Sequence, residues 1–246
     1  MNEIDGIYYE FTKKNIGFER DFLTFKLFEN EKQIDMWEYE LLKPNTDFAG
    51  GLIKNPEQKT RRRSRLKDAG QNVWQMGIYF PHSKFPEKHK TSDLAQHIIK
   101  NKTDDSSSGK IALGMYLTAK ERNFEIFNVD YIVPIPNFRN ENVKAVSIAN
   151  ALSNIINEKE KKIIPVKKVL IKTRDIDTKG MTQLDKDKFF EENQIYQFSP
   201  TLDIRGKTIL LVDDIVTSGN AAKQCMAELK KAGVNQICFY CATTTF

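Results

Sequence analysis

Two adjacent carboxylates, Asp213 and Asp214, follow a short apolar run and precede a small polar loop. Such a pair can accept hydrogen bonds from two neighbouring hydroxyl groups. The loop at residues 217–219 combines two hydroxyl side chains with a glycine, and a helical pattern begins at Ala221. A helix N-terminus offers free N–H groups and the positive end of a dipole, which favour a phosphate. A diol and a phosphate held close together describe a sugar phosphate such as ribose 5-phosphate.

The elements around this stretch predict where these groups meet. Residues 208–212 are β-branched and apolar, which predicts a buried strand that ends before Asp213, and residues 221–231 have helical spacing. Open α/β sheets bind ligands beyond the carboxyl ends of their strands. The alternative is a plain buried strand followed by a capped helix, with both acids merely exposed. A cap needs only one such residue, so the whole series favours a binding site.

The rest of the chain predicts the fold class. Helices are expected at residues 92–102, 111–123, 143–156 and 221–231, and strands at residues 129–137, 163–171, 195–198, 208–212 and 235–246. Strands that alternate with helices predict an α/β fold with a doubly wound, mostly parallel sheet, here over residues 76–246. Residues 1–75 are expected to be an accessory segment, in which alternating runs at 6–11 and 22–28 predict β-rich structure.

Composition narrows the class of protein. The chain has 246 residues with 40% hydrophobic and 29% charged side chains, which is typical of a globular protein. Its net charge of +5 permits an anionic substrate without requiring nucleic acid. The first residues lack the apolar stretch of a signal peptide, and no apolar run is long enough to span a bilayer. We therefore expect a cytoplasmic protein without membrane contact.

The cysteines and histidines do not have the spacing that is typical of metal ligands. The three cysteines, Cys225, Cys238 and Cys241, lie in apolar or helical patterns and are expected to be buried thiols. The three histidines are scattered, so we expect surface residues rather than metal ligands.

Residues 209–221, ILLVDDIVTSGNA, resemble the signature of the type I phosphoribosyltransferases, which bind phosphoribosyl pyrophosphate (PRPP). That signature has four apolar residues, two acids, two apolar residues and then small residues around a glycine. Ala221 stands where the family often has threonine.

The layout from Tyr79 onward is similar to the ComF family of phosphoribosyltransferase-like proteins. The matching features are Tyr79, the HIIKNK helix end at 97–102, Pro134-Ile135-Pro136, Arg174, Gln183-Leu184 and Asn193. The loop after the prolines keeps only Arg139 and Asn142 of the family's usual Arg-Gly-Phe-Asn-Gln run, and Lys188 replaces an arginine. The four-cysteine module with which many members begin has no counterpart in residues 1–75.

The resemblance implies transfer of ribose 5-phosphate from PRPP to a small acceptor, with release of pyrophosphate. Asp213 and Asp214 would be the catalytic pair that holds the ribose hydroxyls. The 5-phosphate would be bound by Thr217, Ser218, Gly219, Asn220 and Ala221, and the pyrophosphate by Arg139, Lys144, Arg174 and Lys179. Mg²⁺ would bridge the hydroxyls and the pyrophosphate without a protein ligand of its own, and the loop at 173–192 would close as a lid. For the basic residues, a solvated loop is an equally good interpretation.

Two other functions stay open at this point. The ComF family is associated with DNA uptake, so a regulatory module that binds PRPP or a nucleotide without turnover is the main alternative. The basic run KTRRRSRLK at residues 59–67 is a candidate for nucleic-acid binding. No aromatic residues interleave with it, which favours a solvated loop. A homodimer is compatible with the sequence, which does not specify an oligomeric state.

Overall fold

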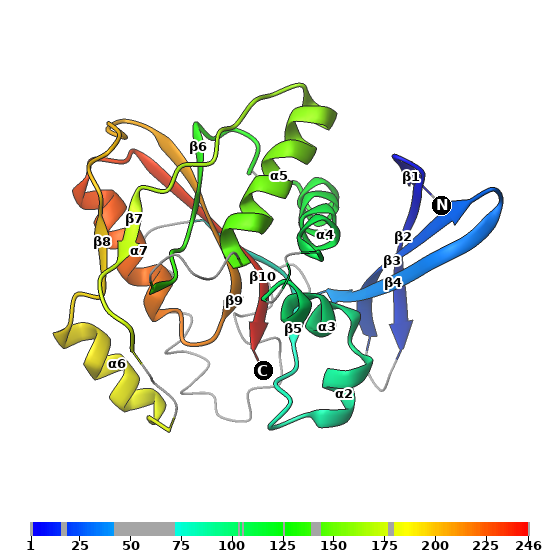
Figure 1. Cartoon of the computed structure of the whole chain (residues 1–246), viewed down its shortest axis with the longest axis horizontal. Helices are drawn as coiled ribbons and strands as arrows, with labels where there is room; N and C mark the ends of the chain where they lie inside the picture. The colour runs from blue at the N-terminus through cyan, green and yellow to red at the C-terminus, as the bar shows by residue number, and fades with distance from the viewer. Residues whose placement is uncertain are drawn as a thin grey trace.

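An eight-stranded mixed sheet runs through the computed structural model (Figure 1). The structure describes residues 2–15, 19–41, 72–102, 104, 106–124, 126–138, 144–176 and 180–245. The order in the sheet is β1 (Asn2–Ile4), β2 (Ile7–Asn15), β3 (Glu19–Glu29), β4 (Lys32–Leu41), β5 (Asn72–Tyr79), β10 (Gln236–Thr245), β9 (Thr208–Val216) and β6 (Tyr131–Pro134). Strands β5, β10, β9 and β6 are parallel to one another, and they form the core of the fold.

Helices cover both faces of the parallel strands. Helices α3 (Asp93–Lys100), α4 (Ser108–Glu121) and α5 (Lys144–Glu160) pack on one face, and α2 (Pro86–Thr91) contacts α3. The other face carries α7 (Asn220–Lys231), α6 (Gln183–Glu192) and a small antiparallel sheet of β7 (Leu170–Lys172) and β8 (Tyr196–Phe198). The predicted doubly wound α/β fold is therefore confirmed.

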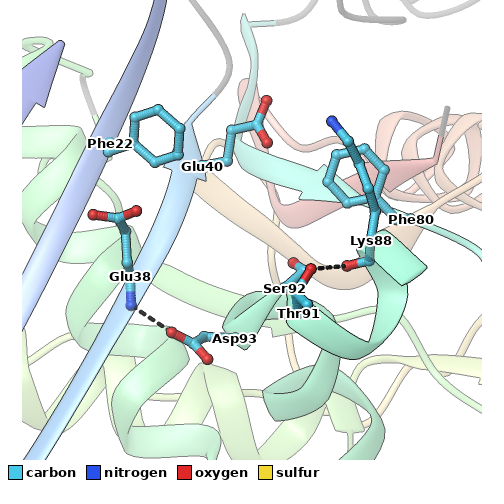
Figure 2. A pocket seen from close by; sticks show the side chains of 8 residues that line it. All are labelled: Phe22, Glu38, Glu40, Phe80, Lys88, Thr91, Ser92 and Asp93. Atoms are coloured by element: carbon cyan, nitrogen blue, oxygen red, sulfur yellow. Dashed lines mark hydrogen bonds between the residues drawn. The ribbon is translucent and has the colours of Figure 1, made fainter. Parts of the chain in front are cut away.

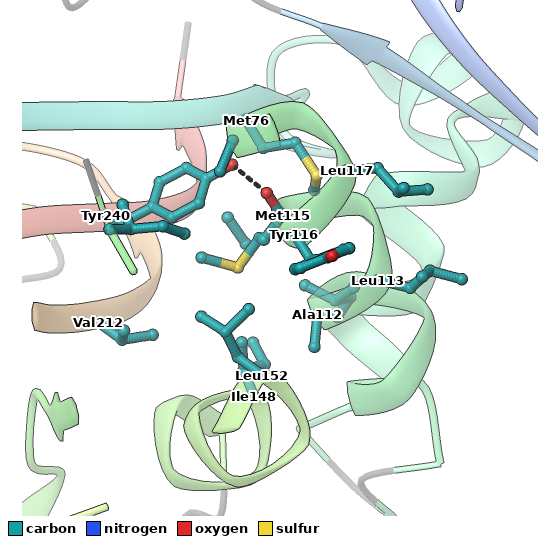
Figure 3. Packing of buried hydrophobic residues seen from close by; sticks show 14 of the residues in the cluster. Met76, Ala112, Leu113, Met115, Tyr116, Leu117, Ile148, Leu152, Val212 and Tyr240 are labelled. Atoms are coloured by element: carbon teal, nitrogen blue, oxygen red, sulfur yellow. Dashed lines mark hydrogen bonds between the residues drawn. The ribbon is translucent and has the colours of Figure 1, made fainter. Parts of the chain in front are cut away.

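Close packing joins α4 to the sheet (Figure 3). The hydroxyl of Tyr240 in β10 donates to the carbonyl of Met115 at 2.8 Å. Position 114 of α4 has no space for a side chain. A Cβ on Gly114 would lie 2.7 Å from the Tyr39 ring and 2.8 Å from Sδ of Met76. Both neighbours are fully buried, so neither can move away easily.

The N-terminal strands extend this sheet as an antiparallel arm, which confirms the predicted β-rich segment. The arm joins the parallel core where Leu41 of β4 pairs with Gly77 of β5. Its inner face is apolar and includes Phe25 and Trp37, whose rings stack at 4.7 Å. The predicted division after residue 75 falls inside β5, and it stays a prediction about how the chain divides into domains.

Before Leu41, β4 does not pair with the described residues of β5, and carboxylates cover this part of its edge. The N–H of Met36 donates to Oδ1 of Asp35 at 2.8 Å, and the N–H of Glu38 donates to Oδ2 of Asp93, the first residue of α3, at 2.8 Å. Lys110 of α4 pairs with the other oxygen of Asp35. Side chains thus bind the backbone donors that a neighbouring strand would otherwise use.

The structure corrects several expected elements. The strand expected at 163–171 is reduced to β7, because Pro165 lacks an N–H and only an isolated bridge forms beside Ile132. His89, expected at the surface, is buried, and its Nδ1 contacts the carbonyl of Phe80 at 2.7 Å. The basic run at 59–67 lies outside the described residues.

No helix in the described ranges is both long and apolar enough to cross a bilayer.

Gly114→Ala should lower the free energy of unfolding by about 1–3 kcal/mol, because the new methyl group overpacks the contact with Tyr39 and Met76. The matched control is Gly109→Ala in the same helix, where a Cβ would meet nothing within 4 Å. That variant should be neutral or gain up to about 1 kcal/mol from helix propensity. Urea denaturation of both variants tests this, and equal effects would contradict the packing argument.

Candidate functional site

The acid pair lies inside β9 rather than after it, which corrects the expected strand end. The ladder with β10 continues to Val216, and the hydroxyl of Thr243 in β10 donates to the carbonyl of Asp214 at 2.9 Å. Successive residues of a strand face opposite sides of the sheet. The two carboxyl groups nevertheless lie close together, since a side-chain hydrogen bond with Asp214 is among the causes that raise the pKa of Asp213.

Burial and mutual repulsion make this pair costly to ionise. Burial raises the pKa of Asp213 well above its ordinary value, and the adjacent charge of Asp214 raises it further. The N–H of Asp214 donates to Oδ1 of Asp213 at 2.9 Å, and the N–H of Ile215 donates to Oδ1 of Asp214 at 2.9 Å. The pair thus presents oxygen acceptors in a site that needs positive charge or hydrogen-bond donors nearby.

Two lysines from other elements supply that positive charge. Burial lowers the pKa of Lys102, just after α3, while the charge of Asp214 acts to raise it. The charge of Lys144, the first residue of α5, favours the ionised form of Asp213. The side-chain amide of Asn101 donates to the carbonyl of Lys144 at 3.2 Å and so ties the two lysine-bearing segments together.

Lys102 and Tyr79 were not among the predicted site residues. The Lys102 ammonium lies 5.8 Å from the centre of the Tyr79 ring, and burial, followed by the charge of Asp214, raises the pKa of that phenol. Both residues belong to the features that resemble the ComF family, so that layout was the available signal. The spacing of residues along the chain could not place them beside Asp214.

The loop before α7 offers hydrogen-bond donors to an anion. Gly219 is the N-cap and adopts φ +80°, a left-handed conformation that glycine adopts without strain. The N–H of Asn220 donates to Oγ of Ser218 over 3.4 Å, a long bond that a phosphate oxygen could replace. The first N–H groups of α7, including that of Ala221, have no partner within the helix. Thr217 is exposed at the mouth of this loop.

A second buried acid supports the loop from outside. The side-chain amide of Asn220 donates to Oδ1 of Asp187 in α6 at 3.1 Å, and both residues are about 5% exposed. This contact fixes the first residue of α7 against α6. Asp187 lies in a charged helical pattern that gave no sign of a buried role.

The four predicted pyrophosphate ligands have different outcomes. Lys144 lies at the acid pair, as described above. Arg174 donates to Oδ1 of Asn193 at 2.7 Å and lies 5.9 Å from the centre of the Phe189 ring, so it is held against α6. Arg139 and Lys179 lie outside the described residues.

A separate polar cavity of about 210 Å³ lies between the arm and the α2–α3 corner (Figure 2). The Phe22 and Phe80 rings flank it, and Glu38 and Glu40 point into it. Each of these carboxylates has a cation: Glu38 pairs with Lys14 at 2.5 Å and Glu40 with Arg20 at 3.3 Å. This cavity is charge-balanced and shares no lining residue with the acid pair or the α7 loop. Across the described ranges, no three His, Cys, Asp or Glu side chains are grouped to hold a metal ion.

Comparison with known protein families gives a match over the C-terminal half of the chain. The model described as "Phosphoribosyl transferase domain" matches residues 119–244, about half of the chain. This span contains β6, the acid pair, the glycine loop and α7. A comparison with curated protein sequences finds no match.

Solved structures show distant similarity. The allosteric regulatory enzyme of purine biosynthesis is 20% identical with a TM-score of 0.35, over 55% of this chain and 25% of that one. Glutamine phosphoribosylpyrophosphate amidotransferase from B. subtilis is 20% identical with a TM-score of 0.35, over 55% and 26%. Purine phosphoribosyltransferase from Pyrococcus horikoshii is 17% identical with a TM-score of 0.35, over 54% and 68%. The chain thus spans about a quarter of the length of the first two proteins.

Asp213→Asn should stabilise the protein at neutral pH. A carboxyl whose pKa is raised by folding costs stability above its unfolded pKa of about 4, so the gain should grow as the pH rises above that value. We expect Asp213→Asn to have the higher free energy of unfolding at pH 7.5 and to lose this advantage at pH 4. Denaturation of both proteins at several pH values tests this. A variant that is less stable at every pH would show that the Asp213 charge is well compensated.

Proposed function

Because the chain belongs to the phosphoribosyl transferase domain family, we propose that it binds PRPP with Mg²⁺ and transfers ribose 5-phosphate to a small acceptor, releasing pyrophosphate. The observation that carries this proposal is the acid pair of β9, on which the charges of Lys102 and Lys144 act, with the N-terminus of α7 just downstream. Diol acceptors, cations and a helix end that suits an anion support binding of the three parts of PRPP.

The 5-phosphate is bound in this proposal by the loop before α7. Backbone N–H groups of Gly219, Asn220 and Ala221 donate to its oxygens, with the Thr217 and Ser218 hydroxyls beside them. The dipole of α7 and the left-handed Gly219 favour an anion in this position. The fixed Asn220 side chain keeps the first turn of α7 in register for this role.

The ribose lies over Asp213 and Asp214, whose carboxylates accept hydrogen bonds from its two hydroxyls. As the bond to pyrophosphate breaks, positive charge develops on the ribose ring. Two carboxylates at this place stabilise that charge more than they stabilise the neutral ground state, which is how electrostatic catalysis lowers a barrier. Orientation of the sugar between the 5-phosphate loop and the pyrophosphate-binding residues lowers the barrier further.

The leaving pyrophosphate is neutralised by basic residues. Lys102 and Lys144 lie at the acid pair, and Arg174 is held on the segment between β7 and α6, which closes over the site as a lid with Lys179. Arg139, which lies outside the described residues, completes the proposed set. Mg²⁺, when bound with PRPP, supplies further neutralisation of the pyrophosphate. The carboxyl oxygens of the acid pair fit Mg²⁺, because they would accept hydrogen bonds from the waters of the ion and from the ribose hydroxyls.

The acceptor proposed here is a base, an amine or a related small molecule. The ComF-like layout of residues 79–246 supports membership of that branch, and we propose a cytoplasmic enzyme with residues 1–75 as an accessory segment. Calorimetry with PRPP, with and without Mg²⁺, combined with an assay of pyrophosphate release, tests the function. Mg²⁺-dependent binding with release supports a transferase, and binding without release under all acceptors tried supports a regulatory module.

Asp213→Asn combined with Asp214→Asn should abolish PRPP binding, because both acceptors for the ribose diol lose their charge. Calorimetry with Mg²⁺ measures the affinity, and circular dichroism checks the fold. Tight Mg²⁺-dependent binding by this double variant would refute the role of the acid pair.

Lys102→Gln should weaken PRPP binding by roughly tenfold, since a charge-assisted hydrogen bond contributes about 1.5–3 kcal/mol. The matched control is Lys100→Gln, two residues earlier and exposed, which removes the same charge from the same segment. Calorimetric Kd values for the two variants distinguish a local contact from a general field effect. Equal losses would mean that Lys102 acts only through long-range charge.

A further inference from the structure

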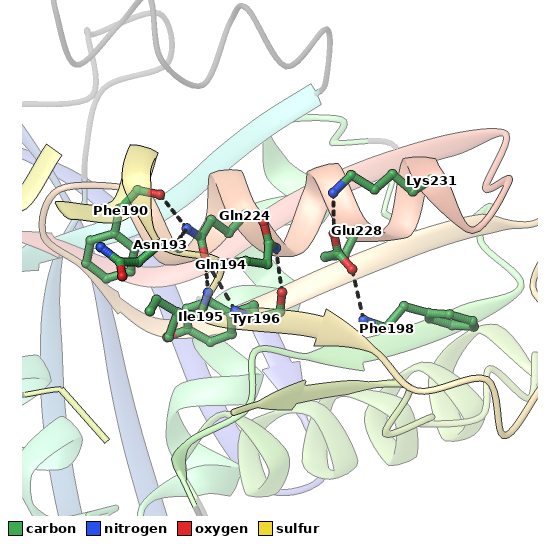
Figure 4. Close-up of polar contacts among 9 residues, drawn as sticks. All are labelled: Phe190, Asn193, Gln194, Ile195, Tyr196, Phe198, Gln224, Glu228 and Lys231. Carbon is green, nitrogen blue, oxygen red and sulfur yellow. Dashed lines mark hydrogen bonds and ion pairs between the residues drawn. The ribbon is translucent and has the colours of Figure 1, made fainter. Parts of the chain in front are cut away.

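Three polar residues on one face of α7 hold the segment from α6 to β8, and Figure 4 shows the contacts of Gln224 and Glu228. Asn220, Gln224 and Glu228 recur every four residues, so their side chains lie in one row along the helix. Asn220 donates to Asp187 in α6, and Glu228 accepts from the N–H of Phe198 in β8 at 3.2 Å. Gln224 lies between them and makes the most contacts of the three.

The side chain of Gln224 uses its full hydrogen-bonding capacity. Its Oε1 accepts from the N–H groups of Ile195 at 2.9 Å and Tyr196 at 3.2 Å. Its Nε2 donates to the carbonyls of Phe190 at 2.6 Å and Asn193 at 2.7 Å. An amide has two donors and two lone pairs on its oxygen, so all are satisfied. Gln224 is 9% exposed, and a buried set of this kind fixes the backbone that it contacts.

Asn193 carries this constraint to Arg174. Its side-chain Nδ2 donates to the carbonyl of Phe189 at 2.8 Å, which leaves Oδ1 facing the Arg174 guanidinium at 2.7 Å. The guanidinium also lies over the Phe189 ring. An arginine side chain on a solvated loop has many rotamers, whereas this one is held at two points. Its other N–H donors stay available for an anion.

Through this chain of contacts, α7 positions the groups that are proposed to bind the two ends of PRPP. The N-terminus of α7 faces the proposed 5-phosphate site, and the middle of α7 determines, through Gln224 and Asn193, where Arg174 lies. We propose that Gln224 is a positioning residue that acts through Asn193 to place Arg174 for the pyrophosphate of PRPP. This inference rests on the proposed function, and it adds a residue that touches no substrate.

The experiment compares three probes by calorimetry: PRPP with Mg²⁺, pyrophosphate with Mg²⁺, and ribose 5-phosphate. Gln224→Leu and Arg174→Gln should each weaken PRPP and pyrophosphate by roughly tenfold, the size of one charged hydrogen bond. Both should leave the affinity for ribose 5-phosphate within about twofold, because the α7 loop is unchanged. The double variant should lose no more than Arg174→Gln alone, since both changes remove one interaction.

Glu228→Leu is the matched control, because it removes a hydrogen bond from the same face of α7 to β8 without touching Asn193. It should leave the affinity for pyrophosphate unchanged. Asn193→Ala gives a second test if Gln224→Leu does not fold, since it removes only the side chain that contacts Arg174. It should weaken pyrophosphate as Arg174→Gln does.

Three results would overturn the inference: equal loss of ribose 5-phosphate and pyrophosphate affinity in Gln224→Leu, additive losses in the double variant, or unchanged pyrophosphate affinity in Asn193→Ala. If the wild-type protein binds PRPP in these cases, the proposed function stands without the inference. If the wild-type protein binds neither PRPP nor pyrophosphate, both fail.

Discussion

Two neighbouring carboxylates in a largely buried strand repel each other and lose solvation, and the surroundings of Asp213 and Asp214 reflect that constraint. The two carboxyl groups lie close together, because a side-chain hydrogen bond with Asp214 is among the causes that raise the pKa of Asp213. The positive charges of Lys102 and Lys144 act on the pair. The thiol of Cys225 and the phenol of Tyr196 also feel the charge of Asp213, and burial raises the pKa of each so that both stay neutral. The pair is therefore balanced by two lysines and surrounded by neutral groups.

Helix α7 is the frame on which the rest of the site is assembled. Its apolar face is buried against the sheet through Ala222, Met226 and Leu229. Its polar row binds the α6–β8 segment, and its first turn faces the glycine loop. One helix thus contacts the sheet, the α6–β8 segment and the glycine loop. These contacts explain why Asn220 and Gln224 are buried, although a surface helix usually exposes its polar residues.

Local patterns predicted what depends on neighbours in the sequence. The existence of strand β9, the start of α7 and the buried cysteines all follow from residue types within a few positions. The fold class follows from the order of such elements. Lys102, Asp187 and Gln224 could not be recognised in this way, because their roles arise from contacts between segments that only the tertiary fold brings together. The end of β9 was misjudged for the same reason, since its last residues are strand because β10 pairs with them.

The carboxylates along β4 have a consequence for the behaviour of the protein in a crowded solution. A strand that is paired along only part of one edge offers a template on which another chain can add a strand. Here Asp35 and Asp93 already bind two of the N–H groups on that edge of β4, and their negative charge would repel the carbonyl oxygens of an incoming strand. This part of the β4 edge is therefore closed to strand addition, although β4 lies inside the sheet between β3 and β5.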